Sequence, residues 1–200
     1  MNPMGWEQKS LLEIGSCKNG LNFSANEEGK TIKYLGVGDF KELTIINDIS
    51  KLKEIELKEL PSEEYILKDG DIVFVRSNGN KNLVGRCLAI YPNNEPTTFS
   101  GFCIRFRKNT DKIEISYLLQ VLKTKSIRKK MAGRGANIQN LNQQILSNLS
   151  ITLPPLAIQT QFADFVAQVD KSKFYQHVEN FISYLKYHKE IKPCQTSIFY

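Results

Sequence analysis

The sequence has no long apolar run and no secretory start. Its apolar stretches are only a few residues long, whereas a membrane-spanning helix needs about 20. The first residues, MNPMGWEQKS, do not combine a basic segment with a following apolar one, so we expect no signal peptide. Cys17, Cys87, Cys103 and Cys194 stand far apart without a CxxC pair, and two histidines are too few to complete a zinc site. We therefore expect buried, reduced thiols in a cytoplasmic protein.

The sequence patterns of common catalytic sites are also absent. There is no GxxxxGK(S/T), HExxH or GxSxG, and the two histidines stand apart from any cluster of acids and cysteines. Gly36 and Gly38 form a GxG without the third glycine of a dinucleotide loop, which favours a simple turn. Asp69 and Asp71 flank a glycine in the pattern of a tight turn that leads into a strand. We expect no catalytic residue, no metal site and no cofactor in this chain.

What the sequence does contain is an uneven distribution of charge. Its 200 residues, 41% of them hydrophobic, suffice for one ordinary domain with an appendage. Residues 1–70 carry 9 Lys and Arg against 13 Asp and Glu, residues 71–140 carry 13 against 4, and residues 141–200 carry 5 against 4. The middle segment therefore holds the positive charge, which indicates either a polyanionic partner or a merely solvated basic surface.

The first half of the chain alternates short β-like runs with turns. Runs rich in β-branched and aromatic residues, bounded by Gly, Asp or Asn, are TIKYLGV (31–37), GDIVFVRS (70–77), NLVGRCLAIY (82–91) and TTFSGFCIRF (97–106). The last two are separated by PNNEP, a strong turn signal. Between the first and second of these runs, KLKEIELKEL (51–60) has helical Glu/Lys spacing and predicts a helix that ends before Pro61.

The hydrophobic period changes to that of a helix after residue 115. Ser116 opens SYLLQVLKTKSIRKKMAG, in which apolar residues are spaced for one buried face and basic residues fill the last turns. Asn140 is suited to cap a short helix, LNQQILSN, and LSITL then alternates like a strand. The pattern predicts an α+β globule with a small twisted sheet and flanking helices.

A second kind of segment begins at two prolines. Pro154 and Pro155 end the strand and start a helix, since proline is tolerated in a first helical turn. A helix of about 30 residues would extend roughly 45 Å, and its apolar stripe predicts pairing with a partner helix, although a five-residue step breaks the heptad. The residues expected at this dimerisation seam are Phe174, Val178, Phe181 and Leu185.

Two polar loops inside the basic segment are candidate contact sites for nucleic acid. VRSNGNKNLVGR (75–86) lies between two predicted strands, and MAGRGANIQN (131–140) joins a basic helix end to a capped helix. Arg, Asn and Gln can read base edges in DNA, while Lys and Arg grip phosphates. The candidate contacts in the loops are Arg76, Asn78, Asn80, Lys81, Arg134, Asn137 and Gln139, and the candidate phosphate contacts on the preceding helix are Lys125, Arg128, Lys129 and Lys130. The structural alternatives are a plain hairpin loop and a C-cap loop.

The order of these features resembles one half of the specificity subunit of type I restriction–modification enzymes. The motifs that carry the resemblance are W-x-x-x-x-L-x-E-I-G (6–15), LKDGDIVFVRS (67–77), LVG (83–85), FSGFCIRFR (99–107), YLL (117–119), the NL that ends the second loop (140–141) and L-P-P-L-x-x-Q (153–159). The resemblance covers residues 6–185, and it rests on the order and spacing of the elements together.

The resemblance implies three parts and a non-catalytic role. Residues 1–153 would form a target recognition domain that binds one half of a bipartite double-stranded DNA site, 154–192 a spacer and dimerisation helix, and 193–200 a tail. Family members dock methyltransferase subunits, which bind S-adenosylmethionine, and restriction subunits. The helix would pair with that of a second half, or with a second copy of this chain in a homodimer. We expect this chain itself to bind no cofactor.

Two departures from the family pattern leave alternatives open. Ile158 stands where the family usually has Glu before Gln159, and the pattern occurs once rather than twice. The chain could therefore be a half-subunit, a truncated frame or a fragment. The other functional hypotheses are a protein-interaction subunit whose basic face docks an acidic partner, and the recognition module of a fused methyltransferase–endonuclease.

Overall fold

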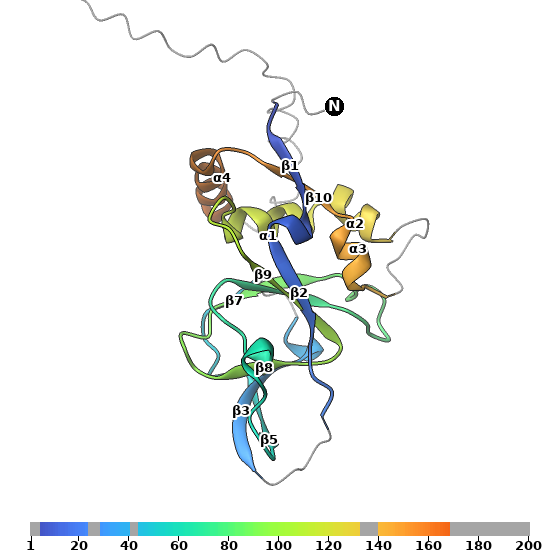
Figure 1. Ribbon diagram of the computed structural model, residues 1–200, viewed down its shortest axis with the longest axis vertical. Helices are drawn as coiled ribbons and strands as arrows, with labels where there is room; N and C mark the ends of the chain where they lie inside the picture. Colours follow the sequence, from blue (N-terminus) through green and yellow to red (C-terminus); the bar gives the residue numbers. More distant parts are fainter. Residues whose placement is uncertain (1–4, 24–28, 41–43, 133–139, 169–200) are drawn as a thin grey trace, which may run out of the picture.

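The computed structural model describes residues 5–23, 29–40, 44–132 and 140–168 and has a mixed α+β fold (Figure 1). Its strands are β1 (Glu7–Ser10), β2 (Gly15–Asn19), β3 (Lys30–Leu35), β4 (Ile45–Ile46), β5 (Lys53–Leu57), β6 (Asp71–Val75), β7 (Cys87–Ile90), β8 (Thr97–Phe99), β9 (Cys103–Lys108) and β10 (Ser150–Leu153). Its helices are η1 (Leu11–Glu13), η2 (Val37–Asp39), η3 (Glu63–Tyr65), α1 (Ile115–Lys123), α2 (Lys125–Ala132), α3 (Gln143–Ser147) and α4 (Leu156–Gln168). Within these ranges no helix is long and apolar enough to cross a membrane.

The strands form three sheets rather than the one small sheet that we expected. The central sheet has five strands in the order β2-β9-β6-β7-β4, in which β6 pairs antiparallel with both β7 and β9. A three-stranded sheet, β5-β3-β8, forms one end of the molecule, and the pair β1-β10 lies toward the other end beside α1 and α4 (Figure 1). The mixed α+β class is confirmed, and the error concerns only how the strands are divided.

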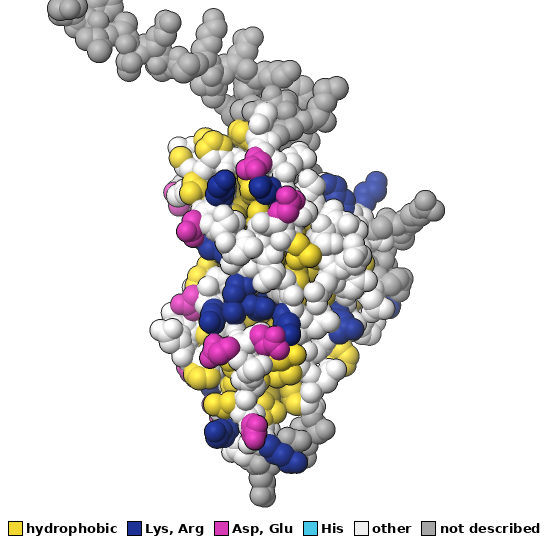
Figure 2. All heavy atoms as spheres, viewed as in Figure 1, with side chains coloured by type: hydrophobic (Ala, Val, Ile, Leu, Met, Phe, Trp, Pro, Cys, Tyr) yellow, Lys and Arg dark blue, Asp and Glu magenta, His cyan; other side chains and the backbone are white. Residues whose placement is uncertain are grey.

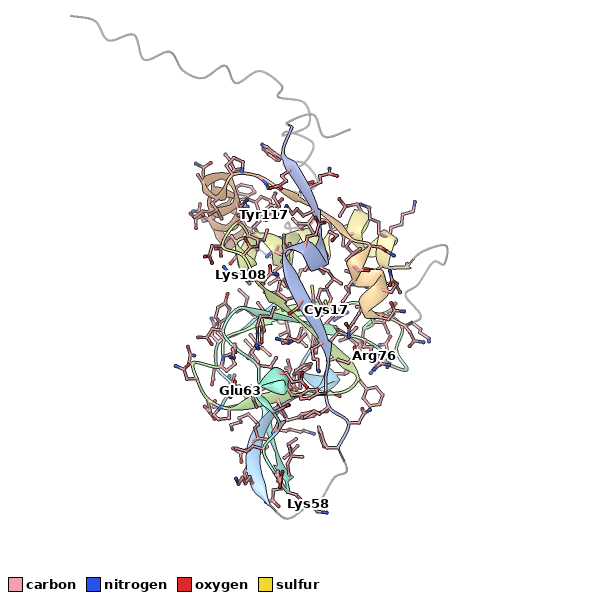
Figure 3. All side chains as sticks on the ribbon, in the orientation of Figure 1. Cys17, Lys58, Glu63, Arg76, Lys108 and Tyr117 are labelled. Carbon is pink, nitrogen blue, oxygen red and sulfur yellow. The ribbon has the colours of Figure 1, made fainter. Side chains whose placement is uncertain are left out.

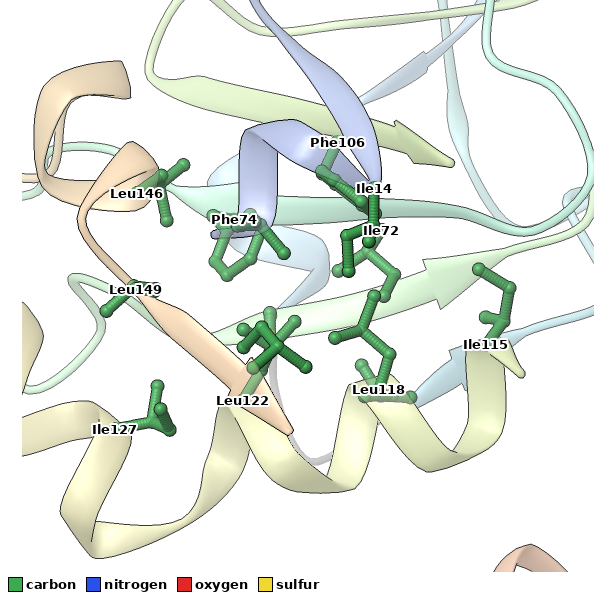
Figure 4. Close-up of a cluster of buried hydrophobic side chains, with 14 of the residues drawn as sticks. Ile14, Ile72, Phe74, Phe106, Ile115, Leu118, Leu122, Ile127, Leu146 and Leu149 are labelled. Carbon is green, nitrogen blue, oxygen red and sulfur yellow. The ribbon is translucent and has the colours of Figure 1, made fainter. Parts of the chain in front are cut away.

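The central sheet is covered on both faces, which explains why its middle strand reads as a continuous apolar run. On β6, Ile72 and Phe74 belong to a core shared with α1, α2 and α3, which we call the helix-side core (Figure 4). The alternating residues, Val73 and Val75, belong to a second core shared with the three-stranded sheet, which we call the sheet-side core. Because successive side chains of a strand point to opposite faces, a strand between two cores must be apolar throughout.

The helix predicted for residues 51–60 is wrong, because this segment contains strand β5. It pairs antiparallel with β3, so that Ile55 lies opposite Ile32 and Glu54 lies opposite Lys33. The last pair forms an ion pair of 2.9 Å. A ten-residue helix without tertiary packing is marginal in water, whereas here the segment pairs with an available strand edge and Glu54 finds a cross-strand partner of opposite charge.

The long helix predicted from Ser116 is two helices. Glu114 caps α1 and its side chain accepts a hydrogen bond from the Ser116 amide, so the helix begins at Ile115, one residue before the predicted start. At Thr124 the backbone leaves the helical region (φ −61°, ψ 147°), and its hydroxyl accepts from the amide of Ile127 in α2. The break redirects the basic helix, yet both pieces still contribute to the helix-side core.

Two further boundaries differ from those expected. Asn142, not Asn140, caps α3, since its side chain accepts from the Ile145 amide at 2.8 Å. The predicted run 97–106 is two strands, β8 and β9, separated by a turn at residues 100–102. By contrast, the strand LSITL is confirmed as β10, and the helix start after Pro154 and Pro155 is confirmed as α4.

The junction between β10 and α4 is held by Gln159, whose side chain is fully buried. Its amide oxygen accepts from the Glu114 amide at 2.9 Å, and its amide nitrogen donates to the carbonyl oxygens of Lys112 at 2.9 Å and Pro154 at 2.8 Å. One side chain thus ties the first turn of α4 to the start of α1 and the end of β10.

An aromatic contact completes this junction. The rings of Tyr117 and Phe162 meet edge to face at 5.7 Å, and the Tyr117 hydroxyl donates to the Thr152 carbonyl at 2.9 Å. The first turns of α4 are therefore packed onto the domain. The rest of the predicted long helix, from residue 169, lies outside the described residues, as do Phe174, Val178, Phe181 and Leu185 of the expected dimerisation seam.

Candidate nucleic-acid interface

The first candidate loop, residues 76–86, is the connection of an antiparallel hairpin between β6 and β7. The hairpin is closed by hydrogen bonds from the Val75 amide to the Arg86 carbonyl and from the Gly85 amide to the Val75 carbonyl, both 2.9 Å. Gly85 has φ +76°, a conformation that favours glycine. The prediction of a loop between two strands is confirmed, and the loop has a defined base.

Two asparagines of this loop organise its backbone. The Asn78 side chain accepts from the Asn80 amide at 2.8 Å, and the Asn80 side chain accepts from the Asn82 amide at 3.1 Å. These are consecutive Asx turns, in which the side-chain oxygen is used and the amide nitrogen is left for another partner. Asn80 and Lys81 are exposed, and Asn78 is half-buried. The loop therefore presents its polar groups on a fixed backbone.

The hairpin loop adjoins both the basic helix and the end of the second candidate loop. The Leu141 amide, which directly follows that loop, donates to the Arg76 carbonyl at 2.8 Å. The Arg128 guanidinium of α2 donates to the Val84 carbonyl at 3.2 Å. Figure 3 places Arg76 on the same side of the molecule as α2 and α3. Segments about 50 residues apart in sequence thus meet along one side, which we call the basic edge: residues 76–86, α2 and residues 140–141.

The basic residues of α2 divide into two groups. Lys125, Lys129 and Lys130 are exposed, whereas Arg128 is half-buried and holds the hairpin loop through its bond to Val84. The exposed lysines suit the predicted contacts with phosphate, and Arg128 also has an internal positioning role that the sequence did not reveal. The remaining predicted contacts, Arg134, Asn137 and Gln139, lie outside the described residues.

A turn at residues 100–102, which we overlooked in the sequence, lies against the same edge. The Phe102 carbonyl accepts from the amides of Arg76 at 2.8 Å and Ser77 at 3.4 Å. In return, the Arg76 guanidinium donates to the Gly101 carbonyl at 3.2 Å. Arg76 is thus partly committed to holding this turn. The Ser-Gly pair inside the FSGF motif is a turn signal that could have located it.

Other charged residues are paired within the protein and lie outside the basic edge. Asp71 is almost fully buried and accepts two bonds from Arg107, at 2.8 and 2.7 Å, while Lys18 pairs with Glu64 at 2.7 Å. In Figure 2, basic and acidic side chains stand beside one another across the middle of the visible face. The predicted turn at residues 69–71 is confirmed, and Gly70 has φ +82°. The ion pair of Asp71 was not foreseen.

The three cysteines that the structure describes are free thiols, and Cys194 lies outside the described residues. Cys87 and Cys103 are buried and Cys17 is half-buried, and none of the three forms a disulfide. Burial raises the pKa of Cys87 to about 11 and that of Cys17 and Cys103 to about 12, so these thiols stay protonated near neutral pH. Among the described residues there is no group of three or more His, Cys, Asp or Glu that could hold a metal.

Comparison with known proteins places these features in a family. The model of the type I restriction modification DNA specificity domain matches residues 3–181. The chain is 33% identical to a putative type I restriction enzyme MjaX specificity subunit of Methanocaldococcus jannaschii, over 84% of this chain and 40% of that protein. It is 29% identical to the type I restriction enzyme StySPI specificity subunit of Salmonella potsdam, over 83% of this chain and 36% of that protein.

The fold agrees with the sequence comparison. The crystal structure of the HsdS subunit from Thermoanaerobacter tengcongensis superposes with a TM-score of 0.57 at 17% identity, covering 93% of this chain and 40% of that one. The chain thus spans less than half the length of the proteins that it resembles.

Proposed function

The chain belongs to the family of type I restriction modification DNA specificity domains, and we propose that it recognises a specific sequence in double-stranded DNA. The observation that carries this proposal is the basic edge, where the hairpin loop meets Leu141, the residue that follows the second candidate loop, beside three exposed lysines. Rigid loops with asparagine and lysine side chains can read base edges, while lysines on a neighbouring helix fix the register on the phosphates.

We further propose that the chain acts by recognition alone. The acids and cysteines of the described residues form no cluster that could hold a metal, and the buried acid Asp71 is used to hold Arg107. The methyltransferase subunits that would carry S-adenosylmethionine, and the restriction subunits, are proposed as partners that this chain directs to the site. Its own role would need no cofactor.

The assembly proposal concerns the C-terminal helix. We propose that residues from 169 continue α4 as the spacer helix and pair with a second half-subunit or a second copy of the chain, through Phe174, Val178, Phe181 and Leu185. The support is the orientation of α4, which Gln159 fixes against the domain. A helix that leaves a domain at a fixed angle can set a fixed distance between two half-sites.

Selection from a pool of random DNA duplexes tests these proposals. The full chain, alone and with the matching methyltransferase subunit, should enrich one motif and should bind it with a steep dependence on salt concentration. If the chain pairs with itself, the motif should be two inverted half-sites separated by a constant spacer. Failure to enrich any motif while the partner subunit is bound would favour a pure protein-interaction subunit.

A further inference from the structure

Phe102 is the most exposed large hydrophobic side chain among the described residues, with 59% of its surface accessible. Moving a phenylalanine side chain from water into the protein interior is favourable by about 1.5–3 kcal/mol. Its neighbours Ser100 and Cys103, on either side of the turn, are buried. Single exposed apolar residues are common on protein surfaces, so the exposure of Phe102 needs further evidence before it indicates a function.

The first such evidence is that the backbone of Phe102 is firmly held. Its amide donates to the Ser100 hydroxyl at 3.1 Å, and its carbonyl accepts from the amides of Arg76 and Ser77. The next amide, that of Cys103, donates to the Ser100 carbonyl at 2.8 Å. A flexible loop could turn an apolar ring inward, but these bonds fix the direction in which the side chain leaves the chain.

The packing of Gly101 confirms that the turn is constrained. Its amide donates to the Leu21 carbonyl at 2.6 Å, and a Cβ atom at this position would collide with the side-chain oxygen of Asn22. The turn is thus clamped between residues 20–22 on one side and Arg76 on the other. Phe102 projects from a rigid support, as is typical of a residue that is prepared for contact with a partner.

The surroundings indicate the kind of partner. Phe102 is bonded through its backbone to Arg76, at the start of the hairpin loop, and lies in the segment 71–140 that carries the excess of positive charge. A protein partner of opposite charge and a nucleic acid would both be attracted to such a surface. The polar loop that begins at Arg76 and contains two Asx turns favours DNA, because the side-chain nitrogens of Asn78 and Asn80, which these turns do not use, suit base edges.

We propose that the Phe102 ring makes an apolar contact with a DNA base and thereby contributes to sequence specificity. This inference rests on the proposed recognition function and adds a residue that is neither polar nor charged to the basic edge. The shared chemistry is that of an apolar surface meeting a base. The ring can contact either the 5-methyl group of a thymine in the major groove or the face of a base that it partly unstacks.

The test compares the full-length wild-type chain with Phe102→Ala on the selected duplex and on a random duplex. The variant should bind the selected duplex about 5- to 100-fold more weakly, the range found for aromatic contacts with bases, and should bind the random duplex almost unchanged. Selection with Phe102→Ala should also relax the preference at one base position. The folding midpoint in urea should not fall, because the ring is exposed.

Leu60→Ala is the matched control, because Leu60 is also exposed, at 46%. It lies two residues beyond Lys58, which Figure 3 places at the end of the molecule formed by β5, apart from Arg76. This variant should bind both duplexes like the wild type. A loss of specific binding equal to that of Phe102→Ala would show that any lost apolar side chain has this effect, and would overturn the proposal.

Two substitutions in the DNA distinguish the sources of the contact. Replacing thymidines by deoxyuridine one at a time removes the methyl group. At the contacted position this change should weaken DNA binding by the wild type but not by Phe102→Ala. If the ring instead unstacks a base, the fluorescence of 2-aminopurine at that position should rise when the wild type binds and should not rise when Phe102→Ala binds. If the wild type enriches no motif, the recognition function itself fails. If it does and Phe102→Ala keeps the same motif and affinity, only this inference fails.

Discussion

The junction at the start of α4 and the basic edge use their polar groups in opposite ways. At the junction the side chain of Gln159 is inaccessible to solvent and makes three hydrogen bonds to the backbone. At the basic edge the loop backbone is also held by hydrogen bonds, but the side chains of Lys81, Phe102 and Lys129 are exposed. In both regions hydrogen bonds hold the backbone, and the regions differ in whether the side chains are buried or exposed.

This difference separates residues that shape the domain from residues that are available to a partner. A buried side-chain amide whose hydrogen-bond partners all come from the chain has no donor or acceptor that a ligand can reach. An exposed side chain on a backbone that cannot move can meet a ligand without a large loss of conformational entropy. The comparison therefore predicts that changes at the junction act on folding and that changes at the basic edge act on binding.

The largest expected effect is at the junction. Gln159→Leu should lower the free energy of unfolding by about 3 kcal/mol, because the buried Pro154 carbonyl and the partly buried Glu114 amide and Lys112 carbonyl each lose this partner. Urea denaturation measures this loss. Gln161→Leu, on an exposed position of the same helix, is the control and should change stability by less than about 0.5 kcal/mol. Equal effects at the two positions would contradict the role given to Gln159.

Gln159 also shows where sequence reasoning stopped. The two prolines and the helix that follows them were predicted correctly, because proline geometry is a local property. The glutamine was noticed only as part of a resemblance, since its partner Glu114 lies 45 residues away in the chain. The same limit explains the ion pair between Asp71 and Arg107, whose residues are 36 positions apart. Long-range hydrogen bonds leave no periodic trace in the sequence.

The errors have a related cause. Residues 51–60 have the charge spacing of a helix, but the available edge of β3 made a strand more favourable, with Glu54 opposite Lys33. Phe102 was read as part of a strand, because the surrounding run is rich in β-forming residues. At the candidate site the loop 75–86 was predicted from its composition, whereas its contact with residue 141 and with Arg128 became visible only in three dimensions.

The next effect in size concerns the exposed lysines of α2. Replacing Lys125, Lys129 and Lys130 together by Gln should leave the unfolding free energy nearly unchanged and weaken binding to specific and random duplexes alike, by about tenfold. Each lost phosphate contact should reduce the salt slope of the binding constant by about 0.9, which amounts to about 3 for the three. Titrations at several salt concentrations measure both quantities.

A matched triple variant lies at the other end of the molecule. Lys51, Lys53 and Lys58 are also exposed and belong to strand β5 and its flanks, so their replacement by Gln removes the same charge from a region outside the basic edge. If the two triple variants reduce the salt slope equally, the binding depends on net charge alone, and the special status of the basic edge is lost.

The smallest effect is expected at a glycine of the hairpin loop. A Cβ atom added at Gly79 would meet no atom within 4 Å, and its φ is not positive, so Gly79→Ala should keep the stability or raise it by up to about 1 kcal/mol. If DNA approaches the loop backbone as closely as only glycine allows, the same methyl group should weaken specific binding a few-fold. Gly101→Ala is the contrasting variant, since its Cβ would collide with Asn22 and should lower stability instead. Unchanged binding by a stable Gly79→Ala would mean that the DNA meets the side chains of this loop and not its backbone.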